Sequence, residues 1–228
     1  MDDYTEEQLT TVLQYHVLGS RVLSGDLPAN GIAETLGGNI YLGYLFNQRV
    51  LINGLTEIKT VDIEKSNGVI HVIDRTLVPP APNVVEIALA LADQGDDSQF
   101  TVLTSLLASE DYADITQAII NAENITVFAP TDAAFEAIAD VVGGLTQEQI
   151  RTVLTYHAAG ARVFSYNLVD GQEVIMLNGQ TVKITFLGGD AILIEDKSGG
   201  EDALVMEANV HGSNGVIHVV DKVLIPNL

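Results

Sequence analysis

The sequence contains no cysteine. This absence excludes disulfides, thiol catalysis and zinc sites built on thiolates. It leaves the cellular compartment open, because many exported bacterial domains do without disulfides. No apolar run approaches the ~18 residues that a membrane-spanning helix needs, so we expect no membrane insertion by the visible chain. Residues 1–4 are neither basic nor apolar, and no signal peptide is visible.

Basic residues are also scarce. The 228 residues include 10 Lys and Arg against 31 Asp and Glu, which gives a formal net charge of −21. This charge opposes nucleic-acid phosphates and anionic membranes, so we expect no nucleic-acid partner. The acidic residues are scattered in pairs, a pattern typical of a solvated surface, although a saline habitat or loose cation binding also fits it.

Catalytic signatures are missing as well. The sequence has no Gly-x-Ser-x-Gly elbow, His-Glu-x-x-His pair, Walker loop or Gly-x-Gly-x-x-Gly fingerprint. The acidic stretch 93–97 lacks the glycine and glutamate positions of a calcium loop and is predicted to be a solvated loop. We therefore expect a protein that is not an enzyme and that holds no cofactor or metal.

The main feature that is present is an internal repeat. The octet Asn-Gly-Val-Ile-His-Val-Ile-Asp at 67–74 recurs almost unchanged at 214–221, an offset of 147 residues from His71 to His218. Residues 11–22 match 152–163, with an offset of 141 from Tyr15 to Tyr156. The difference of about six residues between the two offsets is consistent with loop variation.

Each octet predicts a turn followed by a buried strand. Asn-Gly favours a tight turn, and the β-branched run after it favours a strand. Alternation places Ile217 and Val219 on one face and His218 and Val220 on the other. Both faces are apolar, so we expect the strand to be covered on both sides with the histidine inside.

A short amphipathic helix is predicted in each copy. Thr5 with Gln8, and Thr146 with Gln149, have the spacing of a capping box. The apolar residues that follow recur at helical spacing, and the helices are expected to end near Gly19 and Gly160.

Four of the five histidines lie on apolar faces. The helical ones are His16 and His157, and the strand ones are His71 and His218. We expect buried, neutral imidazoles hydrogen-bonded to backbone rather than metal or acid-base groups. His211 has no counterpart in the first copy and is predicted to be an exposed loop residue.

The remaining segments predict a mixed α+β chain. The prolines near residues 79–82 indicate a domain boundary. Predicted strands cover 39–45, 49–52, 125–130, 173–177, 181–187, 191–195 and 204–210. Asn178-Gly179 predicts a hairpin between 173–177 and 181–187. Predicted helices begin at Asn83, at Ser98, at Asp114 and after the capping residue Thr131.

Three motifs in fixed order resemble the fasciclin domain. Residues 126–135 (Thr-Val-Phe-Ala-Pro-Thr-Asp-Ala-Ala-Phe) resemble its first box, Tyr156-His157 its central motif and residues 214–221 its second box. The resemblance covers 84–228 as a complete domain and 1–79 as the C-terminal part of another, with 80–83 as a linker. It implies a wedge-like β-sandwich with a layer of short helices, in a protein that is secreted, on the cell surface or periplasmic.

The first copy has no counterpart of residues 100–142. A domain without its opening helices and strand is expected to expose apolar surface and an unpaired strand edge. We therefore expect that Met1 marks an expression or cleavage boundary, or that another chain supplies the missing part. Self-association through the truncated first domain is one form of the second alternative.

The resemblance also implies interaction residues. The Tyr-His positions of the family correspond to Tyr15, His16, Tyr156 and His157, and the Asp-Ile position to Asp62 and Ile63. The second copy has Asn209 and Val210 at that last position, which departs from the family pattern. From the residues alone, both tyrosines are expected to be core rings whose hydroxyls reach a backbone partner.

Two functions follow from this reasoning. The first is a non-enzymatic extracellular or cell-surface module for adhesion or matrix contacts, with a protein or a polysaccharide as partner. The second is an envelope-associated protein that binds a small molecule or carbohydrate in a groove between helices and sheet. An adhesin is expected to show a flat patch and avidity from tandem copies, and a ligand binder a concave pocket with convergent polar groups.

Overall fold

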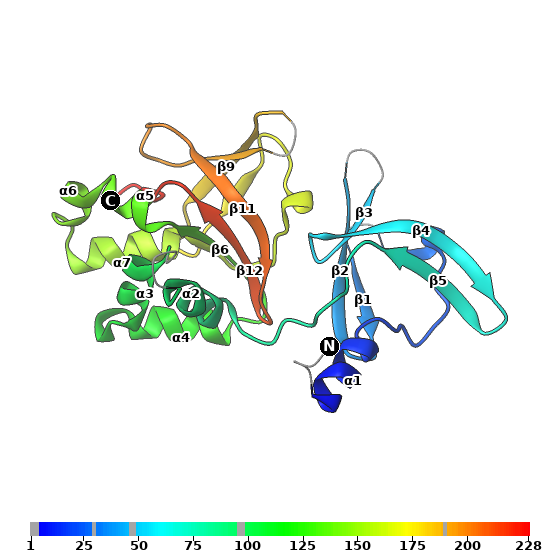
Figure 1. Cartoon of the computed structure of the whole chain (residues 1–228). Helices are drawn as coiled ribbons and strands as arrows, with labels where there is room; N and C mark the ends of the chain where they lie inside the picture. Colours follow the sequence, from blue (N-terminus) through cyan, green and yellow to red (C-terminus); the bar gives the residue numbers. More distant parts are fainter. Residues whose placement is uncertain (1–4, 29–30, 46–48, 95–98, 189–190) are drawn as a thin grey trace. The chain divides into compact units, whose positions relative to one another are not determined.

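The chain divides into two compact units. The structure, a computed structural model, describes residues 5–28, 31–45, 49–94, 99–188 and 191–228. Unit 1 comprises residues 1–80 with 165–167, and unit 2 comprises 81–164 with 168–228. Each unit contains its own β-sheet, and only unit 2 adds a layer of helices to it among the described residues (Figure 1).

Unit 2 is built on a seven-stranded sheet. The strand β6 runs parallel to β12, and every other neighbouring pair is antiparallel. The predicted strands and the hairpin around residues 178–179 are confirmed to within two residues at each end. In sheet order the strands are β7 (Ala158–Ala159), β6 (Ile125–Pro130), β12 (Gly215–Val220), β11 (Ala203–His211), β10 (Ile192–Glu195), β9 (Thr181–Phe186) and β8 (Glu173–Ile175).

Short helices make up the second layer of unit 2. Helices α2, α3, α4 and α7 gather on one side of the β6–β12 pair (Figure 1). The predicted α+β fold class is therefore confirmed. The helices are α2 (Val84–Ala92), α3 (Thr101–Ala108), α4 (Ala113–Asn121), α5 (Asp132–Glu136), α6 (Ala139–Val142) and α7 (Gln147–Tyr156), with the 3₁₀ turn η3 (Glu110–Tyr112). The 3₁₀ turn η4 (Ser165–Asn167) is assigned to unit 1.

Strand β12 joins the two halves of the unit 2 core. All six of its residues are buried. Ile217 and Val219 pack in the core cluster that includes the helix side chains. Val220 packs in the second core cluster, which includes Phe128. The prediction of a strand covered on both faces is confirmed here, and His218 is 1% exposed.

Local capping rules set most helix starts. Thr5 with Gln8, and Thr146 with Gln149, form the predicted capping boxes. Asn83 and Glu86 form a third, and Thr131 caps α5. Both repeated helices end earlier than predicted, at Gln14 and Tyr156, several residues before the glycines.

Helix α3 starts by a different device. Ser98, its predicted start, lies outside the described residues, and α3 begins at Thr101. The carboxylate of Asp132 accepts from the amides of Thr101 (3.0 Å) and Val102 (2.9 Å) and from the Thr101 hydroxyl (2.7 Å). A residue at the start of α5 thus caps α3 across 31 positions, which local sequence reasoning missed.

The described part of unit 1 is a five-stranded antiparallel sheet with one α-helix. Strands β2 and β3 match the predicted 39–45 and 49–52, whereas β1 and β4 were not predicted. Strands β4 and β5 form a long twisted hairpin (Figure 1). The elements are α1 (Glu6–Gln14), η1 (Ser24–Asp26), β1 (Ile32–Thr35), β2 (Gly38–Tyr44), β3 (Val50–Ile52), β4 (Thr56–Lys65) and β5 (Gly68–Ile73), in sheet order β1-β2-β3-β4-β5.

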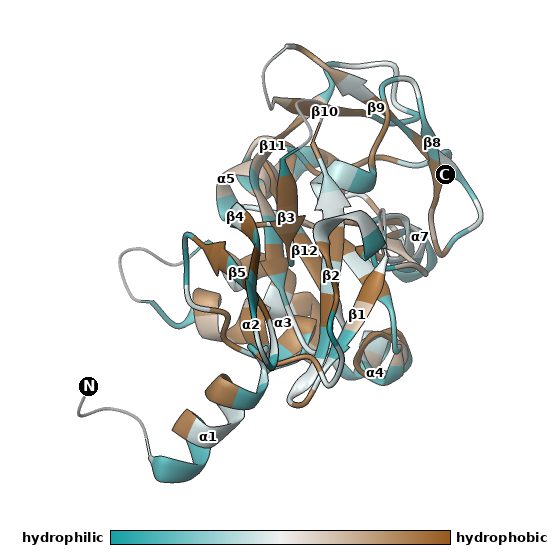
Figure 2. Cartoon of the chain, turned by 90° about the vertical axis from the view of Figure 1, so that its right-hand side faces the viewer, coloured by the Kyte–Doolittle hydropathy of each residue, from teal (hydrophilic) through white to brown (hydrophobic). Residues whose placement is uncertain are grey.

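The prediction of a buried strand is wrong for the first octet. Ile70 and Val72 on β5 are 51% and 42% exposed, whereas the equivalent Ile217 and Val219 are 1% and 3% exposed. Helix α1 has no buried residue, and His16 is exposed rather than buried. Figure 2 shows apolar residues on α1 and β5. The reason is that the described part of unit 1 has no counterpart of α2 to α6 or of β6.

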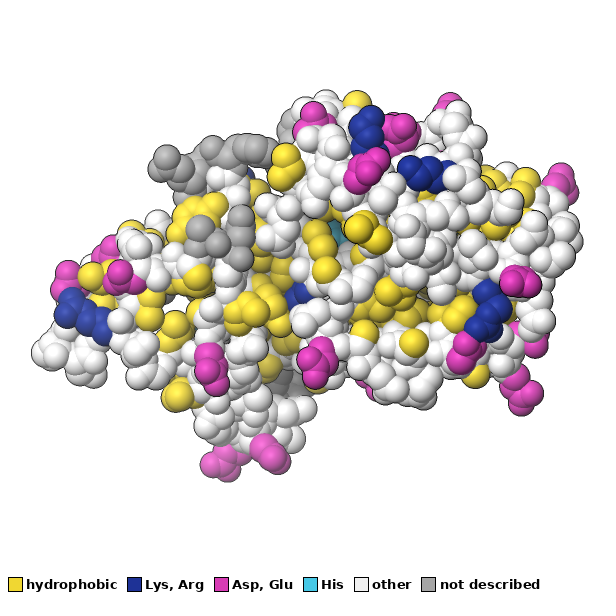
Figure 3. All heavy atoms as spheres, turned by 180° about the vertical axis from the view of Figure 1, so that it is seen from behind, with side chains coloured by type: hydrophobic (Ala, Val, Ile, Leu, Met, Phe, Trp, Pro, Cys, Tyr) yellow, Lys and Arg dark blue, Asp and Glu magenta, His cyan; other side chains and the backbone are white. Residues whose placement is uncertain are grey.

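The acidic residues are distributed over the surface. Figure 3 shows acidic side chains spread over one face of the molecule, with apolar side chains surfacing between them. This agrees with the interpretation of the acidic pairs as solvated groups. Among the described residues, no helix has the length and apolar character to cross a membrane.

The Asp132 cap provides a stability test. We expect Asp132→Ala to lower the free energy of unfolding of unit 2 by about 1–2 kcal/mol, because it removes the acceptor for two helix amides. Asp140→Ala removes an acidic residue from the first turn of α6 without a recorded side-chain hydrogen bond, and is expected to stay within about 0.5 kcal/mol of the parent. Urea unfolding followed by circular dichroism measures both. Equal effects of the two substitutions would contradict the capping role.

Candidate interaction site

The tyrosines of the two Tyr-His pairs are core residues. Tyr15 and Tyr156 are buried. The Tyr15 hydroxyl donates to the carbonyl of Asn39 at 2.8 Å, and the Tyr156 hydroxyl donates to the carbonyl of Thr181 at 2.8 Å. Burial raises the pKa of Tyr156 to about 12. The prediction of core rings with backbone-bonded hydroxyls is confirmed.

The adjacent histidines join the end of the Tyr-His helix to the segment that follows the last strand of each unit. His157 Nδ1 lies 2.7 Å from the Val153 carbonyl, and its Nε2 lies 2.9 Å from the Leu224 amide. The carbonyl requires a donor and the amide requires an acceptor, so this imidazole is neutral with its proton on Nδ1. Burial lowers the pKa of His157 to about 4. The predicted neutral, backbone-bonded imidazole is confirmed at this position.

The same connection exists in unit 1. His16 Nδ1 lies 2.7 Å from the Val12 carbonyl, and its Nε2 lies 3.0 Å from the Leu77 amide. The bonding pattern is therefore a property of the repeat and does not depend on burial of the ring, since His16 is exposed.

The strand histidines form a second connection. His218 Nε2 lies 2.9 Å from the Val163 carbonyl, and its ring stacks on Phe128 with centroids 5.5 Å apart. In unit 1, His71 Nε2 lies 3.0 Å from the Val22 carbonyl. Burial lowers the pKa of His218 to about 4. Each strand histidine thus ties its strand to the segment that follows the Tyr-His helix.

The prediction for His211 was wrong. It lies at the end of β11 rather than in a loop, is half-buried, and packs edge-to-face on Phe164 with centroids 5.4 Å apart. Burial and the nearby Arg162 lower its pKa to about 4. The predicted strand 204–210 ended one residue short of it.

Asp62 and Asn209 occupy the same backbone position in the two units. Both have a left-handed conformation, with φ of 59° and 67°, and both lie where the ladder with the following strand shifts register. Asp and Asn adopt this conformation more readily than other non-glycine residues. The departure from the family pattern at Asn209 therefore preserves the bulge geometry.

The two bulge residues differ in exposure, since Asp62 is half-buried and Asn209 is fully within the core. The Asp62 carboxylate accepts from the Ser24 hydroxyl (2.5 Å) and the Ser24 amide (2.8 Å), and these bonds lower its pKa. Asn209 is buried. The next residues, Ile63 and Val210, are half-buried and pair with the strand that carries the repeated octet.

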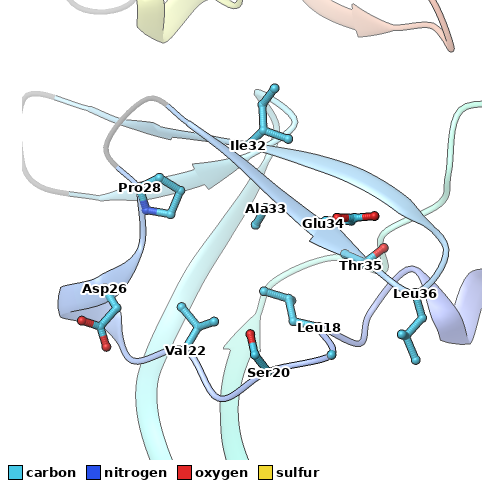
Figure 4. Close-up of a pocket in the computed structure, with 11 residues that line it drawn as sticks. Leu18, Ser20, Val22, Asp26, Pro28, Ile32, Ala33, Glu34, Thr35 and Leu36 are labelled. Atoms are coloured by element: carbon cyan, nitrogen blue, oxygen red, sulfur yellow. The ribbon is translucent and has the colours of Figure 1, made fainter.

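Unit 1 contains two sizeable cavities. One, of about 470 Å³, lies between residues 18–28 and β1, and Figure 4 shows Leu18 and Val22 pointing toward the strand that carries Ala33. The other, of about 360 Å³, is lined by residues 15–22, by β5 and by Leu77. In unit 2, two apolar spaces bordered by helices and sheet measure about 30 and 20 Å³, which is on the order of one water molecule each.

No metal site is evident in the described part of the chain. None of its His, Asp and Glu side chains form a group of three or more that could hold an ion. His157 uses both ring nitrogens in hydrogen bonds to backbone groups. His218 makes one such bond through Nε2 and stacks on Phe128.

Comparison with known proteins places these features in context. The family profile described as Fasciclin domain matches residues 1–79 and 98–226. Human periostin is 28% identical over 96% of this chain, and transforming growth factor-beta-induced protein ig-h3 of Sus scrofa is 27% identical over 96%. A fasciclin-like arabinogalactan protein of Cercospora beticola, CTB11, is 28% identical over 75%. The chain spans 25%, 31% and 42% of the lengths of these three relatives.

A solved structure supports the fold. It is a FAS1 domain pair from the insect cell adhesion molecule Fasciclin I, with a TM-score of 0.52 and 16% identity. The match covers 96% of this chain and 80% of the other. At this identity the likeness shows the fold alone.

The buried histidines predict how unit 2 responds to acid. His157, His211 and His218 have pKa values of about 4, below the value of about 6.5 expected in the unfolded chain. The unfolded chain therefore binds more protons between these values, and the free energy of unfolding falls as the pH drops from about 6.5 toward about 4.

Histidine ring resonances measured by NMR across this pH range test the expectation directly. All three rings should stay neutral to about pH 5, while the same rings in urea-unfolded chain titrate near pH 6.5. A midpoint near 6.5 for any of them in the folded protein would contradict the assignment of that ring as buried and neutral.

Proposed function

Because the chain belongs to the fasciclin domain family, we propose that it is a non-enzymatic interaction module for adhesion or matrix contacts, acting outside the cell or at its surface. Sequence similarity to periostin, to ig-h3 and to a fasciclin-like arabinogalactan protein supports this proposal. The strongly acidic sequence is typical of a well-hydrated interaction module.

We also propose the division into a partial domain at 1–79, a linker at 80–83 and a complete domain at 84–228, which the separation of the compact units after Pro80 supports.

The observation that carries the proposal is the apolar face of unit 1. We define this face by five exposed residues, two on α1, one just after it and two on β5: Leu9, Leu13, Val17, Ile70 and Val72. Exposed apolar residues that occur singly need no explanation. The counterparts of this set in unit 2 pack together in one core cluster, and they are Ile150, Leu154, Ala158, Ile217 and Val219. We therefore propose that the apolar face of unit 1 is a contact surface.

The family's interaction positions lie partly within reach of such a partner. His16 is exposed, and Asp62, Ile63 and Val210 are half-buried. Tyr15, Tyr156, His157 and Asn209 are buried. We propose that the first group contacts partners and that the second group holds the backbone from which the first group projects.

A second candidate function is the binding of a small molecule or carbohydrate. The 470 Å³ pocket of unit 1 favours it, since Ser20, Asp26, Glu34 and Thr35 bring oxygen atoms to a lining that is otherwise largely apolar (Figure 4). Carboxylate and hydroxyl oxygens accept hydrogen bonds from sugar hydroxyls. Calorimetric titration with neutral oligosaccharides separates the candidates, because Glu34→Gln weakens binding only if this pocket holds the ligand.

Adhesion through the apolar face predicts homotypic clustering. Beads coated with the chain are expected to aggregate at about 0.15 M salt, where repulsion between exposed charges is screened beyond roughly 8 Å. The variant with Leu13→Glu and Ile70→Glu is expected to aggregate roughly tenfold more slowly, because it places charge on an apolar contact.

The control variant carries Val169→Glu and Ile175→Glu. These side chains are also apolar and exposed, but they lie in unit 2, so the control adds the same charge away from the apolar face. If both double variants slow clustering equally, the effect is one of net charge and the apolar face is not adhesive.

A further inference from the structure

One asparagine of the sequence has the spacing of a glycan acceptor. Asn124-Ile125-Thr126 is an Asn-x-Thr triplet whose central residue is not proline, which is the acceptor pattern for N-linked oligosaccharides. No other asparagine of the 228 residues has serine or threonine at the second position after it. The pattern alone is a weak signal, so the surroundings of Asn124 decide whether it can carry a sugar.

Asn124 lies in the short connection between α4 and β6. It follows the end of α4 at Asn121 and is exposed. The next two residues, Ile125 and Thr126, are 1% and 0% exposed. A bulky, hydrated oligosaccharide needs a surface position, and within this triplet only the asparagine provides one.

Arg162 fixes the orientation of the Asn124 amide. Its Nε donates to Asn124 Oδ1 at 3.3 Å. Its terminal nitrogens donate to three carbonyls of the β11–β12 turn, those of Gly212, Ser213 and Gly215. A guanidinium only donates, so the amide atom that faces it is the oxygen, and Nδ2 is turned away from it.

The Nδ2 atom of Asn124 is left for chemistry. Among the described residues, no hydrogen bond engages it, whereas Nδ2 of Asn178 donates to Thr152 (3.4 Å) and Nδ2 of Asn214 donates to Ile119 (2.8 Å). A glycosidic bond to Nδ2 replaces one of its two hydrogens and leaves Oδ1 unchanged. The hydrogen bond from Arg162 is therefore compatible with an attached sugar.

The third residue of the triplet is unavailable in the folded protein. The Thr126 hydroxyl donates to the Ala161 carbonyl at 2.6 Å and accepts from the Val163 amide at 2.8 Å. The acceptor pattern includes a hydroxyl because the transferase binds it, and that requires an accessible, extended triplet. Since β6 lies between β12 and β7, the folded chain does not present the triplet to an enzyme.

The order of folding leaves time for the transfer. Ala161, which accepts from the Thr126 hydroxyl, is 35 positions further along the chain, and β12, the parallel partner of β6, lies near the end of unit 2. Contacts of high sequence separation form late, and parallel pairing is slow. During export, the triplet therefore emerges before the elements that bury it.

We propose that Asn124 carries an N-linked oligosaccharide, attached as the chain crosses a membrane and before β6 pairs with β12 and β7. In this step Nδ2 attacks the anomeric carbon of a sugar carried on a lipid pyrophosphate. A C–N bond forms, the C–O bond to the pyrophosphate breaks, the lipid pyrophosphate leaves and Nδ2 loses one proton. The proposal rests on the proposed location outside the cell, because the donor and the transferase act on exported chains.

A glycan on Asn124 restricts which surface of unit 2 can contact a partner. The groups beside it are the β11–β12 turn, held by Arg162, and the start of α2, where the Val84 amide donates to Asn214 at 3.0 Å. A bulky sugar shields these groups from close protein contact. Partner contacts are therefore directed to other parts of the surface.

The intact mass of the secreted chain tests the proposal. The 228-residue chain is expressed behind a secretory leader in a eukaryotic host, which supplies the lipid-linked donor, and is then digested with peptide N-glycosidase. We expect a mass excess that the digestion removes, with conversion of Asn124 to aspartate located by tandem mass spectrometry. Asn124→Gln is expected to abolish the mass excess, because the longer side chain displaces the acceptor nitrogen.

The control variant is Asn121→Gln. Asn121 is also exposed but lies outside the triplet, so this variant is expected to keep the full mass excess. Urea midpoints of both variants are expected to match that of the parent, since both side chains are exposed. Thr126→Ser keeps the hydroxyl and is expected to retain the glycan.

A second assay tests the order of events. Purified protein without glycan, and a peptide of residues 120–130, are each incubated with an oligosaccharyltransferase and a lipid-linked oligosaccharide. The peptide is expected to be modified at least about tenfold faster, because modification of the folded protein requires local unfolding of β6.

Three outcomes would overturn the proposal. A secreted chain without glycan, or a mass excess that survives Asn124→Gln, removes the site. Equal rates for the folded protein and the peptide remove attachment before folding. The bead assay uses protein from a host that adds no glycan, so clustering without a glycan in the secretory host leaves the proposed function standing and removes only the modification.

Discussion

The parallel pairing of β6 with β12 is the interaction on which the structure of unit 2 depends. It closes the open edge of the octet strand, brings Phe128 into the centre of one core cluster, and leads directly into α5 and the cap of α3. With β6 and the helices in place, all six residues of β12 are buried. Unit 1 has an almost identical octet in β5 without that pairing, and there Ile70 and Val72 remain exposed. One local sequence thus has two burial states, and the neighbouring elements decide between them.

This comparison explains what sequence reasoning could and could not predict. Alternation, capping boxes and the Asn178-Gly179 hairpin act within a few residues, and the structure confirms the elements predicted from them. Burial depends on elements distant in sequence, so the predictions failed at β5 and His16, where those elements are missing from the described chain. The Asp132 cap was missed for the same reason, since donor and acceptor are 31 positions apart.

The candidate interaction residues were predicted in position but only partly in role. A neutral imidazole offers one donor and one acceptor, and the helix histidines spend both on backbone groups. Their recurrence in both copies is therefore explained by folding, without a ligand. The left-handed bulge at Asp62 and Asn209 was not predicted, although the exchange of Asp for Asn at one repeat position is a signal for it. The proposed partner contacts therefore fall on the exposed His16 and on the half-buried Asp62, Ile63 and Val210.

An open strand edge and exposed apolar residues usually invite indiscriminate association, so the acidity of this chain matters for unit 1. A net charge of −21 makes two copies repel each other at long range, although three acids on or beside the β4–β5 hairpin, Glu57, Glu64 and Asp74, are each ion-paired with a basic residue. At about 0.15 M salt this repulsion is screened beyond roughly 8 Å, so it slows the approach of two copies without preventing contact between their apolar faces.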